Sequence, residues 1–222
     1  ITQVTGTHDG PPVRAGVSIL DIGAGTWLAL AVITALLHRE KTGEGSSVAT
    51  SLFETGANWV SYHVAAHQVT GEPSGRFGSG HPAFSPYGIF PTKTAQVCIG
   101  IGGDSIFRSF CQALSLEYLL DDENYATNPA RVKNDLALRM IIEAKLSTIS
   151  GEEIVNKLEQ AGVACDIVQN PEELLTDPQA DAVAIMLRQE VSGFGELRFP
   201  GLPITFNRRR PVIRAEFGGK NG

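Results

Sequence analysis

The longest apolar pattern of the chain covers residues 22–41, which are mostly Ala, Leu, Ile and Val without an interior proline. This composition favours a helix, and Thr42-Gly43 can end it, because glycine readily adopts the left-handed conformation that follows a helix. Apolar residues surround most of the helix circumference, which predicts a buried helix. The run between Gly25 and His38 is too short to span a bilayer, so we expect a core helix and no membrane segment.

Shorter patterns predict the other elements. Short apolar runs predict strands at residues 48–52, 87–92, 96–101 and 166–168. Helical periodicity predicts helices at residues 53–68, 105–114, 134–148 and 151–161, and a helical turn at 171–175. Ser150 is expected to cap the helix at 151–161, with Glu153 completing a capping box. Residues 190–191 and 196–199 are expected to pair as a hairpin through Gly193 and Gly195.

The order of these elements mixes strands and helices without strict alternation, which predicts an α+β arrangement for the second half of the chain. The composition changes near residue 70, and residues 70–82 are rich in Gly, Pro and Ser. A segment of this composition is typical of a linker or of an active-site loop.

Composition and charge narrow the function classes. With 222 residues, of which 42% are hydrophobic, the chain can bury a sizeable core in one or two domains. A net charge of -6 offers no general attraction to nucleic acid or to an anionic membrane. The basic cluster Arg208-Arg209-Arg210 is expected to be solvated or to lie at a packing edge. Three cysteines without metal-type spacing suit a reducing compartment and are expected to be buried apolar side chains: Cys98, Cys111 and Cys165.

Asp21 is the main candidate for chemistry. It precedes the long apolar helix and is flanked by Gly16, Gly23 and Gly25. At or near the helix N-cap, a carboxylate is favoured by free backbone N–H groups and by the positive end of the helix dipole. The same N–H groups can hold a substrate oxygen, and the glycines let a ligand come close. The same spacing is also expected if Asp21 is only a helix cap, which is the commoner role of Asp at such a position.

Motifs along essentially the whole chain resemble those of one enzyme family. Residues 21–45, followed by Val48, Ser51-Leu52 and Glu54, are similar to the signature of the family III CoA-transferases, the group that contains formyl-CoA transferase, carnitine CoA-transferase and α-methylacyl-CoA racemase. Further strings agree in the family's order, at residues 6–12, 81–82, 86–92, 128–132, 161–165 and 177–179. Each string alone is weak, but their common order makes the match specific.

The resemblance implies an α/β fold class: a partial CoA-transferase family III fold, with the remainder of a larger α/β domain and a small α+β domain. We expect residues 1–68 to belong to the large domain, 69–82 to form a linker or glycine-containing loop, 83–190 to form the small domain, and 191–222 to return toward the large domain. Family members are considerably longer, and their N-terminal part precedes the string that opens this chain. Ile1 is therefore expected to be an internal residue.

The resemblance also implies an activity. In the transferases, the aspartate at the position of Asp21 is the nucleophile that carries the acyl group and then CoA. We therefore expect transfer of CoA between an acyl-CoA thioester and a carboxylic acid acceptor through an aspartyl-CoA intermediate, with the CoA thioester as substrate and with no bound cofactor or metal. An interlocked homodimer and a cytoplasmic location are expected as well. This chain alone is expected to be an incomplete enzyme, because most nucleotide contacts of the family lie in the N-terminal part.

Gly78, Gly80 and His81 are the candidate substrate-binding residues. A glycine loop permits close approach and closure, as it does in formyl-CoA transferase, although a flexible linker explains the same glycines and this loop lacks that enzyme's run of consecutive glycines. His81 can donate a hydrogen bond to an acyl carbonyl, and a turn residue before proline explains it as well. Three more residues are expected to be structural: Glu54 as a surface or helix-start acid, and Trp27 and Trp59 as core aromatics.

Two other functions stay open. In the acyl-CoA racemases of this family, the equivalent aspartate works as an acid or base at the α-carbon, opposite a histidine that lies upstream of Ile1. A truncated noncatalytic relative would retain the core without the CoA-binding part. The length of the intact reading frame and the presence of the upstream histidine separate these possibilities from a transferase.

Overall fold

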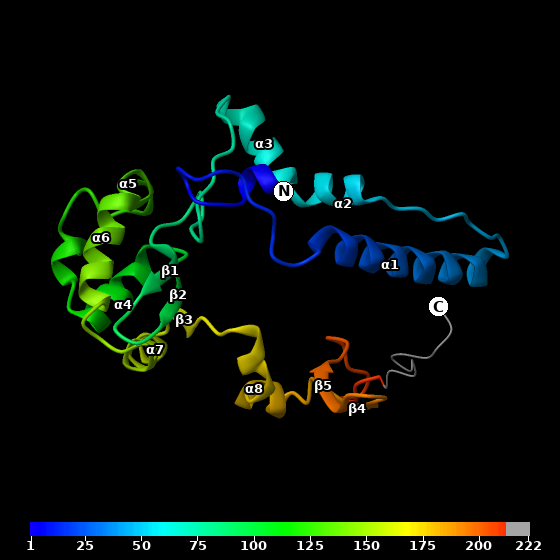
Figure 1. Ribbon diagram of the computed structural model, residues 1–222. Helices are drawn as coiled ribbons and strands as arrows, with labels where there is room; N and C mark the ends of the chain where they lie inside the picture. The colour runs from blue at the N-terminus through cyan, green and yellow to red at the C-terminus, as the bar shows by residue number, and fades with distance from the viewer. Residues whose placement is uncertain (212–222) are drawn as a thin grey trace. The chain divides into compact units, whose positions relative to one another are not determined.

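The computed structural model describes residues 1–211 and divides into two compact units, Ile1–Ile167 and a second that begins at Val168. Figure 1 shows the order of elements in the first unit, in which N-terminal helices are followed by a small sheet with helices around it. Helices and strands are mixed, as expected for the fold class. The expected domain boundaries near residues 68, 82 and 190 stay predictions.

The long apolar helix, α1, spans Ile19–Thr42 and follows a short 3₁₀ helix at Thr2–Val4. It begins before residue 22, where the sequence placed its start, because Ser18 is the N-cap. Its C-terminus is the expected one, with Gly43 in the left-handed conformation at φ 78°.

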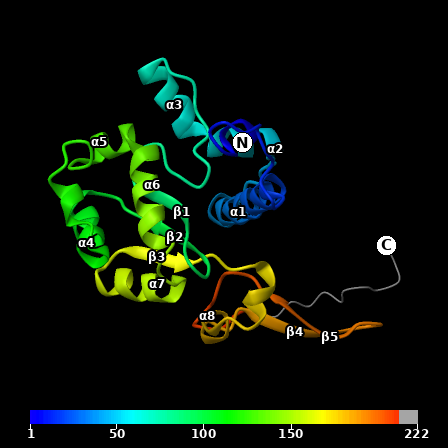
Figure 2. The same cartoon turned by 60° about the vertical axis from the view of Figure 1, so that its left-hand side comes forward.

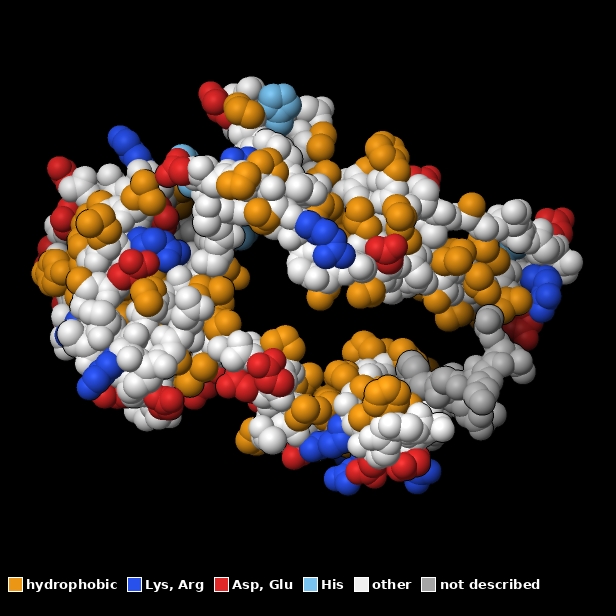
Figure 3. Space-filling model, viewed as in Figure 1, with side chains coloured by type: hydrophobic (Ala, Val, Ile, Leu, Met, Phe, Trp, Pro, Cys, Tyr) orange, Lys and Arg blue, Asp and Glu red, His pale blue; other side chains and the backbone are white. Residues whose placement is uncertain are grey.

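Most of α1 is exposed, which corrects the expectation of a buried core helix. Gly23 is the buried residue of this helix, whereas Ile22, Leu30 and Ile33 are 63%, 53% and 56% exposed. Figure 3 shows apolar side chains at the surface along α1. The physical reason is that α2 is the element of the described chain that packs extensively against α1, so it covers one stripe of a helix that is apolar on most sides.

The length of α1 also corrects the argument against a membrane segment. Among the described residues, α1 is the one helix that is long and apolar enough to cross a membrane by length and composition, with 24 residues. The same properties occur in core helices of soluble proteins, so they are a weak indication of a membrane span.

The region after α1 differs from the sequence prediction. Residues 48–52 do not form a strand, because a strand requires a hydrogen-bonded neighbour and the described chain places none beside them. The single helix expected at 53–68 is two helices, α2 at Leu52–Trp59 and α3 at Ser61–Thr70. They are separated at Val60, whose backbone angles (φ -97°, ψ 11°) leave the helical range.

The small sheet of the first unit has the strand order β1-β2-β3, all antiparallel, formed by Tyr87–Pro91, Gln96–Gly100 and Ala164–Ile167. Figure 2 shows α4, α6 and α7 gathered around it. The helices of this region are α4 (Asp104–Leu114), α5 (Asn128–Lys133), α6 (Asp135–Leu146) and α7 (Gly151–Gln160), with a 3₁₀ helix at Glu117–Leu120. The expected strands at 87–92 and 96–101 and the helices at 105–114, 134–148 and 151–161 are confirmed within a few residues. Ser150 caps α7 as expected, accepting a hydrogen bond from the Glu153 N–H.

The hydrophobic core lies between this sheet and its helices. Its fully buried side chains alternate along β2, where Val97 and Ile99 point inward, and follow the inner faces of α4, α6 and α7. Cys98 lies between Val97 and Ile99 and is exposed, so the expectation that all three cysteines are buried is wrong for Cys98. Cys111 is buried and Cys165 is half-buried.

A buried cation, Arg131 of α5, joins the helices to the chain segment that precedes β1. Its guanidinium is fully buried and donates to the carbonyl oxygens of Ser85 (2.7 Å) and Tyr125 (3.0 Å) and to Oδ1 of Asp104 (2.8 Å). It also lies 4.2 Å from the ring centroid of Phe107. Hydrogen bonds on several sides offset the cost of burying this charge.

The outer edge of β1 is covered by two polar side chains. Ser79 Oγ accepts from the Ile89 N–H at 2.8 Å, and Arg139 donates to the Ile89 carbonyl at 2.9 Å while lying over the ring of Phe90. A Cβ at Gly88 would lie 2.8 Å from atoms of both Ser79 and Arg139, so this position requires glycine. The glycine loop before β1 is therefore fastened to the sheet edge.

The second unit contains the expected helical turn and hairpin. It comprises a 3₁₀ helix at Pro171–Leu175, α8 at Pro178–Ala182, and the paired strands β4 (Met186–Val191) and β5 (Gly195–Pro200). Arg210 donates to the carbonyls of Val183, Ala184 and Leu202, so this member of the basic cluster has the expected packing role. It satisfies carbonyl oxygens after the end of α8.

Candidate functional site

Asp21 lies in the first turn of α1 and is exposed. It is near the N-cap, as expected, although Ser18 occupies the cap itself. The Ser18 hydroxyl does not bond to the helix but accepts from Arg14 at 3.0 Å. No salt bridge or side-chain hydrogen bond within residues 1–211 engages the Asp21 carboxylate. The carboxylate is thus open to a ligand at the positive end of the helix dipole.

Backbone N–H groups without a hydrogen-bond partner in the described chain lie near this carboxylate. The Ile19 N–H bonds to the Val17 carbonyl at 2.8 Å, and the Ile22 N–H bonds to the Ser18 carbonyl at 3.1 Å. In the described chain, the N–H groups of Leu20 and Asp21 between them have no such partner. Unpaired N–H groups at a helix N-terminus are suited to hold an anionic oxygen.

The glycines near Asp21 have two different roles. Gly25 is one helical turn after Asp21, on the same face, and a Cβ built there meets nothing within 4 Å. Gly23 faces α2, where a Cβ would lie 2.5 Å from Cζ2 of Trp59 and 3.0 Å from Cγ2 of Thr55. Gly25 therefore leaves the Asp21 face open, as expected, whereas Gly23 serves helix packing.

A pocket of about 330 Å³ lies between α1, α2 and the extended segment before α2. Its lining combines apolar and polar residues: Trp27, Ala31, Ala49, Thr50, Glu54, Thr55 and Asn58. Trp27 is 42% exposed, which corrects its expected place in the core, because within residues 1–211 only α2 packs extensively against α1. Trp59 is half-buried against Gly23. Glu54 is the helix-start acid that the sequence predicts. Its Oε2 accepts a hydrogen bond from the Ser51 hydroxyl, and its backbone N–H donates to the hydroxyl oxygen of Ser51.

The glycine loop that carries Gly78 and Gly80 is held at both glycines. The Gly78 N–H donates to the Gly6 carbonyl at 2.9 Å, and the Gly80 N–H donates to the Phe77 carbonyl at 2.7 Å. Gly78 has a positive φ of 60°, and a Cβ on Gly80 would lie 2.9 Å from the Phe77 carbonyl oxygen. This part of the loop has defined contacts of its own, unlike a free linker.

His81 is a turn residue with one ring nitrogen already engaged. Its Nδ1 accepts from the Ala83 N–H at 3.1 Å, and its ring lies 5.0 Å from that of Phe84 and 5.5 Å from that of Tyr87. An Nδ1 that accepts an N–H carries no proton, so in the neutral ring the proton is on Nε2. His81 therefore presents an Nε2–H donor, as the proposed contact to an acyl carbonyl requires.

The structure does not bring all of the sequence-predicted site residues into contact with one another. No hydrogen bond or ring contact joins Asp21 directly to Gly78, Gly80 or His81 within the described residues. No group of three or more His, Cys, Asp or Glu is placed to hold a metal ion in residues 1–211. A residue that the sequence analysis did not single out, Arg76, connects the glycine loop to the N-terminal segment by hydrogen bonds to the carbonyls of Thr7 and Gly10. In the sequence, the signal for this role was that Arg76 stands among glycines.

Comparison with known proteins gives a consistent result. The model of CoA-transferase family III matches residues 1–216. Succinate–glutarate CoA-transferase of Agrobacterium fabrum is 30% identical over 214 residues, 96% of this chain and 52% of that protein. Human succinyl-CoA:glutarate CoA-transferase is 28% identical over 94% of this chain and 48% of its own length. The chain thus spans about half the length of the curated relatives it matches.

Solved structures show the same fold. A CaiB/BaiF family protein from Brucella suis superposes with a TM-score of 0.75 at 26% identity, over 95% of this chain and 54% of that one. Rv3272 from M. tuberculosis superposes with a TM-score of 0.80 at 20% identity, over 96% of this chain and 56% of that one. The α/β fold class, as part of a larger fold, is confirmed.

Proposed function

Because this chain belongs to CoA-transferase family III, we propose that the protein transfers CoA from an acyl-CoA thioester to a carboxylic acid, with Asp21 as the nucleophile. The observation that carries the proposal is an unpaired, exposed carboxylate in the first turn of a long helix, beside free backbone N–H groups and an open glycine face. The relatives named above are CoA-transferases, which supports the reaction class.

The first half of the reaction makes an enzyme-bound CoA. The Asp21 carboxylate attacks the thioester carbonyl of the donor, and the C–S bond breaks to give a mixed anhydride and CoA thiolate. The thiolate then attacks the Asp21 acyl carbon of the anhydride. This step releases the donor's carboxylate and leaves an aspartyl-CoA thioester.

The second half repeats the chemistry with the acceptor. The acceptor carboxylate attacks the aspartyl-CoA thioester, which gives a second anhydride and again frees CoA thiolate. The thiolate attacks the acceptor's acyl carbon, so that the new acyl-CoA leaves and the Asp21 carboxylate is restored. The cycle consumes no water and no net proton.

Each step passes through a tetrahedral oxyanion that needs hydrogen-bond donors. The N–H groups of Leu20 and Asp21 are donors within the first turn of α1. His81, through Nε2–H, and the backbone of Gly78 and Gly80 are proposed to contact the substrate from the glycine loop. We propose short dicarboxylic acids as acceptors, because both relatives described above are named for glutarate.

A trapping experiment with the whole protein tests the proposal. Incubation with succinyl-CoA alone, followed by hydroxylamine, is expected to convert the Asp21 carboxyl to a hydroxamate that peptide mass spectrometry locates. Adding glutarate should give glutaryl-CoA. Modification at another residue would contradict the nucleophile assignment. Deuterium uptake at the α-carbon of a 2-methylacyl-CoA without CoA transfer would favour the racemase instead. The homodimer and the cytoplasmic location stay predictions.

A further inference from the structure

Arg76 binds a turn that is distant in sequence from its own loop. Its Nη2 donates to the Gly10 carbonyl at 2.7 Å and its Nε donates to the Thr7 carbonyl at 3.3 Å. Thr7 and Gly10 are the two ends of one turn, which the Gly10 N–H closes on the Thr7 carbonyl at 3.2 Å. The planar guanidinium fork matches two carbonyl oxygens at once, a geometry that a lysine ammonium does not reproduce.

The same two segments are joined by backbone atoms next to Arg76. The Gly78 N–H donates to the Gly6 carbonyl at 2.9 Å. Gly6 has a φ of 123°, and a Cβ there would lie 2.9 Å from the Pro11 carbonyl oxygen and 3.3 Å from Cδ of Arg76. The close approach therefore requires glycine, and the contact between the two segments is specific.

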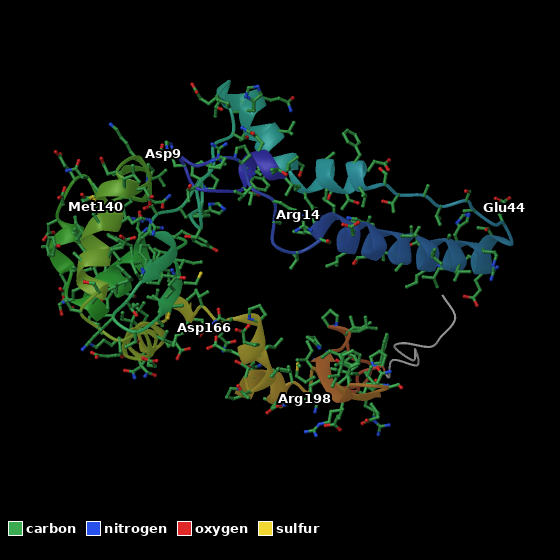
Figure 4. The ribbon with its side chains drawn as sticks, viewed as in Figure 1. Asp9, Arg14, Glu44, Met140, Asp166 and Arg198 are labelled. Carbon is green, nitrogen blue, oxygen red and sulfur yellow. The ribbon has the colours of Figure 1, made fainter. Side chains whose placement is uncertain are left out.

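The bound turn leads directly into the helix that carries Asp21. After the turn, the Val13 N–H bonds to the Thr5 carbonyl at 3.1 Å, which folds the segment back on itself. Arg14 then donates to the hydroxyl of Ser18, the N-cap of α1. Figure 4 labels Asp9 on the turn and Arg14 at the approach to α1. Hydrogen bonds thus order the segment that leads from the bound turn to Ser18, the N-cap of α1.

We propose that Arg76 is a positioning residue of the CoA-transfer reaction: it fastens the glycine loop of residues 75–80 to the Thr7–Gly10 turn, and so holds that loop in place relative to the Asp21 end of α1. This inference rests on the proposed function. Arg76 is half-buried and is not itself a group that touches the reacting atoms.

The expected consequence concerns water. In the proposed function this loop contacts the substrate through Gly78, Gly80 and His81, so a loop held in place excludes water from the anhydride and the thioester, whereas a released loop admits it. Water then competes with the acceptor carboxylate, and hydrolysis releases free CoA. The ratio of acyl-CoA hydrolysis to CoA transfer is therefore the quantity to measure. Once the spontaneous hydrolysis measured without enzyme is subtracted, this ratio does not depend on how much of a variant is folded, so a loss of folded protein leaves it unchanged.

The test compares Arg76→Met, Arg76→Lys and Arg188→Met in the whole protein. Arg188 lies on the exposed hairpin of the second unit, paired with Glu196, and serves as the matched control. With succinyl-CoA and glutarate, Arg76→Met is expected to raise the hydrolysis-to-transfer ratio about tenfold or more. Arg76→Lys should be intermediate, because it keeps the charge but loses the fork. Added guanidinium ion at millimolar concentration should lower the ratio of Arg76→Met, and methylammonium should not. Arg188→Met should match the wild type.

The outcomes separate the inference from the function it rests on. A wild type that neither transfers CoA nor forms an Asp21 adduct overturns both. A wild type that transfers CoA, with an unchanged ratio in Arg76→Met, overturns the role of Arg76 alone. If Arg76→Met does not accumulate as folded protein, Arg76→Lys decides, and a ratio equal to that of the wild type again counts against the proposal.

Discussion

Gly23 of α1 and Trp59 of α2 are in contact at a position where a side chain on Gly23 would overlap the indole ring. The glycine lets α2 approach α1 two residues after Asp21. Leu20 packs on the same neighbour, since a Cβ at Gly56 would lie 3.5 Å from its Cδ2. Close packing of two helices through glycines fixes the first turn of α1, where the proposed nucleophile needs a defined orientation.

Gly23→Ala should destabilise the protein by about 1–3 kcal/mol, because its Cβ must displace the Trp59 ring. Gly25→Ala is the matched control on the same helix and should be neutral or stabilising by up to about 1 kcal/mol, since its Cβ enters open space and alanine favours helix. Thermal and urea unfolding of both variants measure the difference. Equal losses would show that Gly23 is not a packing glycine.

Gly25→Leu is expected to separate activity from stability. Its side chain would project on the face that Asp21 shares, so CoA transfer should fall at least about tenfold while the unfolding temperature stays near that of the wild type. Steady-state rates with saturating succinyl-CoA provide the measurement. Full activity in this variant would contradict substrate approach over Gly25.

Asp21→Asn should abolish CoA transfer by several orders of magnitude, because an amide does not form the anhydride. The unfolding free energy should fall by no more than about 1 kcal/mol, the contribution of an exposed charge in the first turn of a helix. Glu40→Gln, an exposed carboxylate near the other end of α1, is the control and should retain wild-type turnover. An Asn variant that keeps its transfer rate would exclude Asp21 as nucleophile.

Arg131→Met should destabilise the small α+β region by about 2–5 kcal/mol, because it leaves the carbonyls of Ser85 and Tyr125 without their donor. Asp104→Asn should cost less, because Asp104 is 58% exposed and water can replace one of its bonds. Denaturant unfolding ranks the two variants. A larger loss for Asp104→Asn would show that the ion pair, rather than the carbonyl contacts, dominates this cluster.

Cys98 and Cys111 should differ sharply in reactivity. Burial raises the pKa of the Cys111 thiol to about 12, so at pH 8 on the order of one molecule in ten thousand carries the reactive thiolate. Cys98 is exposed on β2 and should react first. Iodoacetamide labelling followed by peptide mass spectrometry in the native and unfolded protein reads out both sites. Native labelling of Cys111 as fast as Cys98 would contradict the buried core.

Local patterns were sufficient for much of the fold. The short apolar runs at β1 and β2 and the helical periodicity of α4, α6 and α7 predicted those elements within a few residues, and Ser150 was recognisable as a cap. These features depend on residues two to four apart, whose side chains share a face by backbone geometry alone. Because successive side chains of a strand point to opposite faces, the inward-facing Val97 and Ile99 indicate that Cys98 points outward. The expectation that Cys98 is buried rested instead on the usual burial of cysteine in proteins.

The sequence by itself therefore determined most of the helices and strands, the family motifs and Asp21 as the carboxylate at the start of the long helix. Only the tertiary structure decided which apolar surfaces are covered, that Gly23 packs while Gly25 stays open, and that Arg76 and Arg131 hold distant segments. The reason is physical: Arg76 and Gly10 are 66 residues apart, and Arg131 and Ser85 are 46 apart. Contacts over such separations depend on how the elements pack, which no local periodicity encodes.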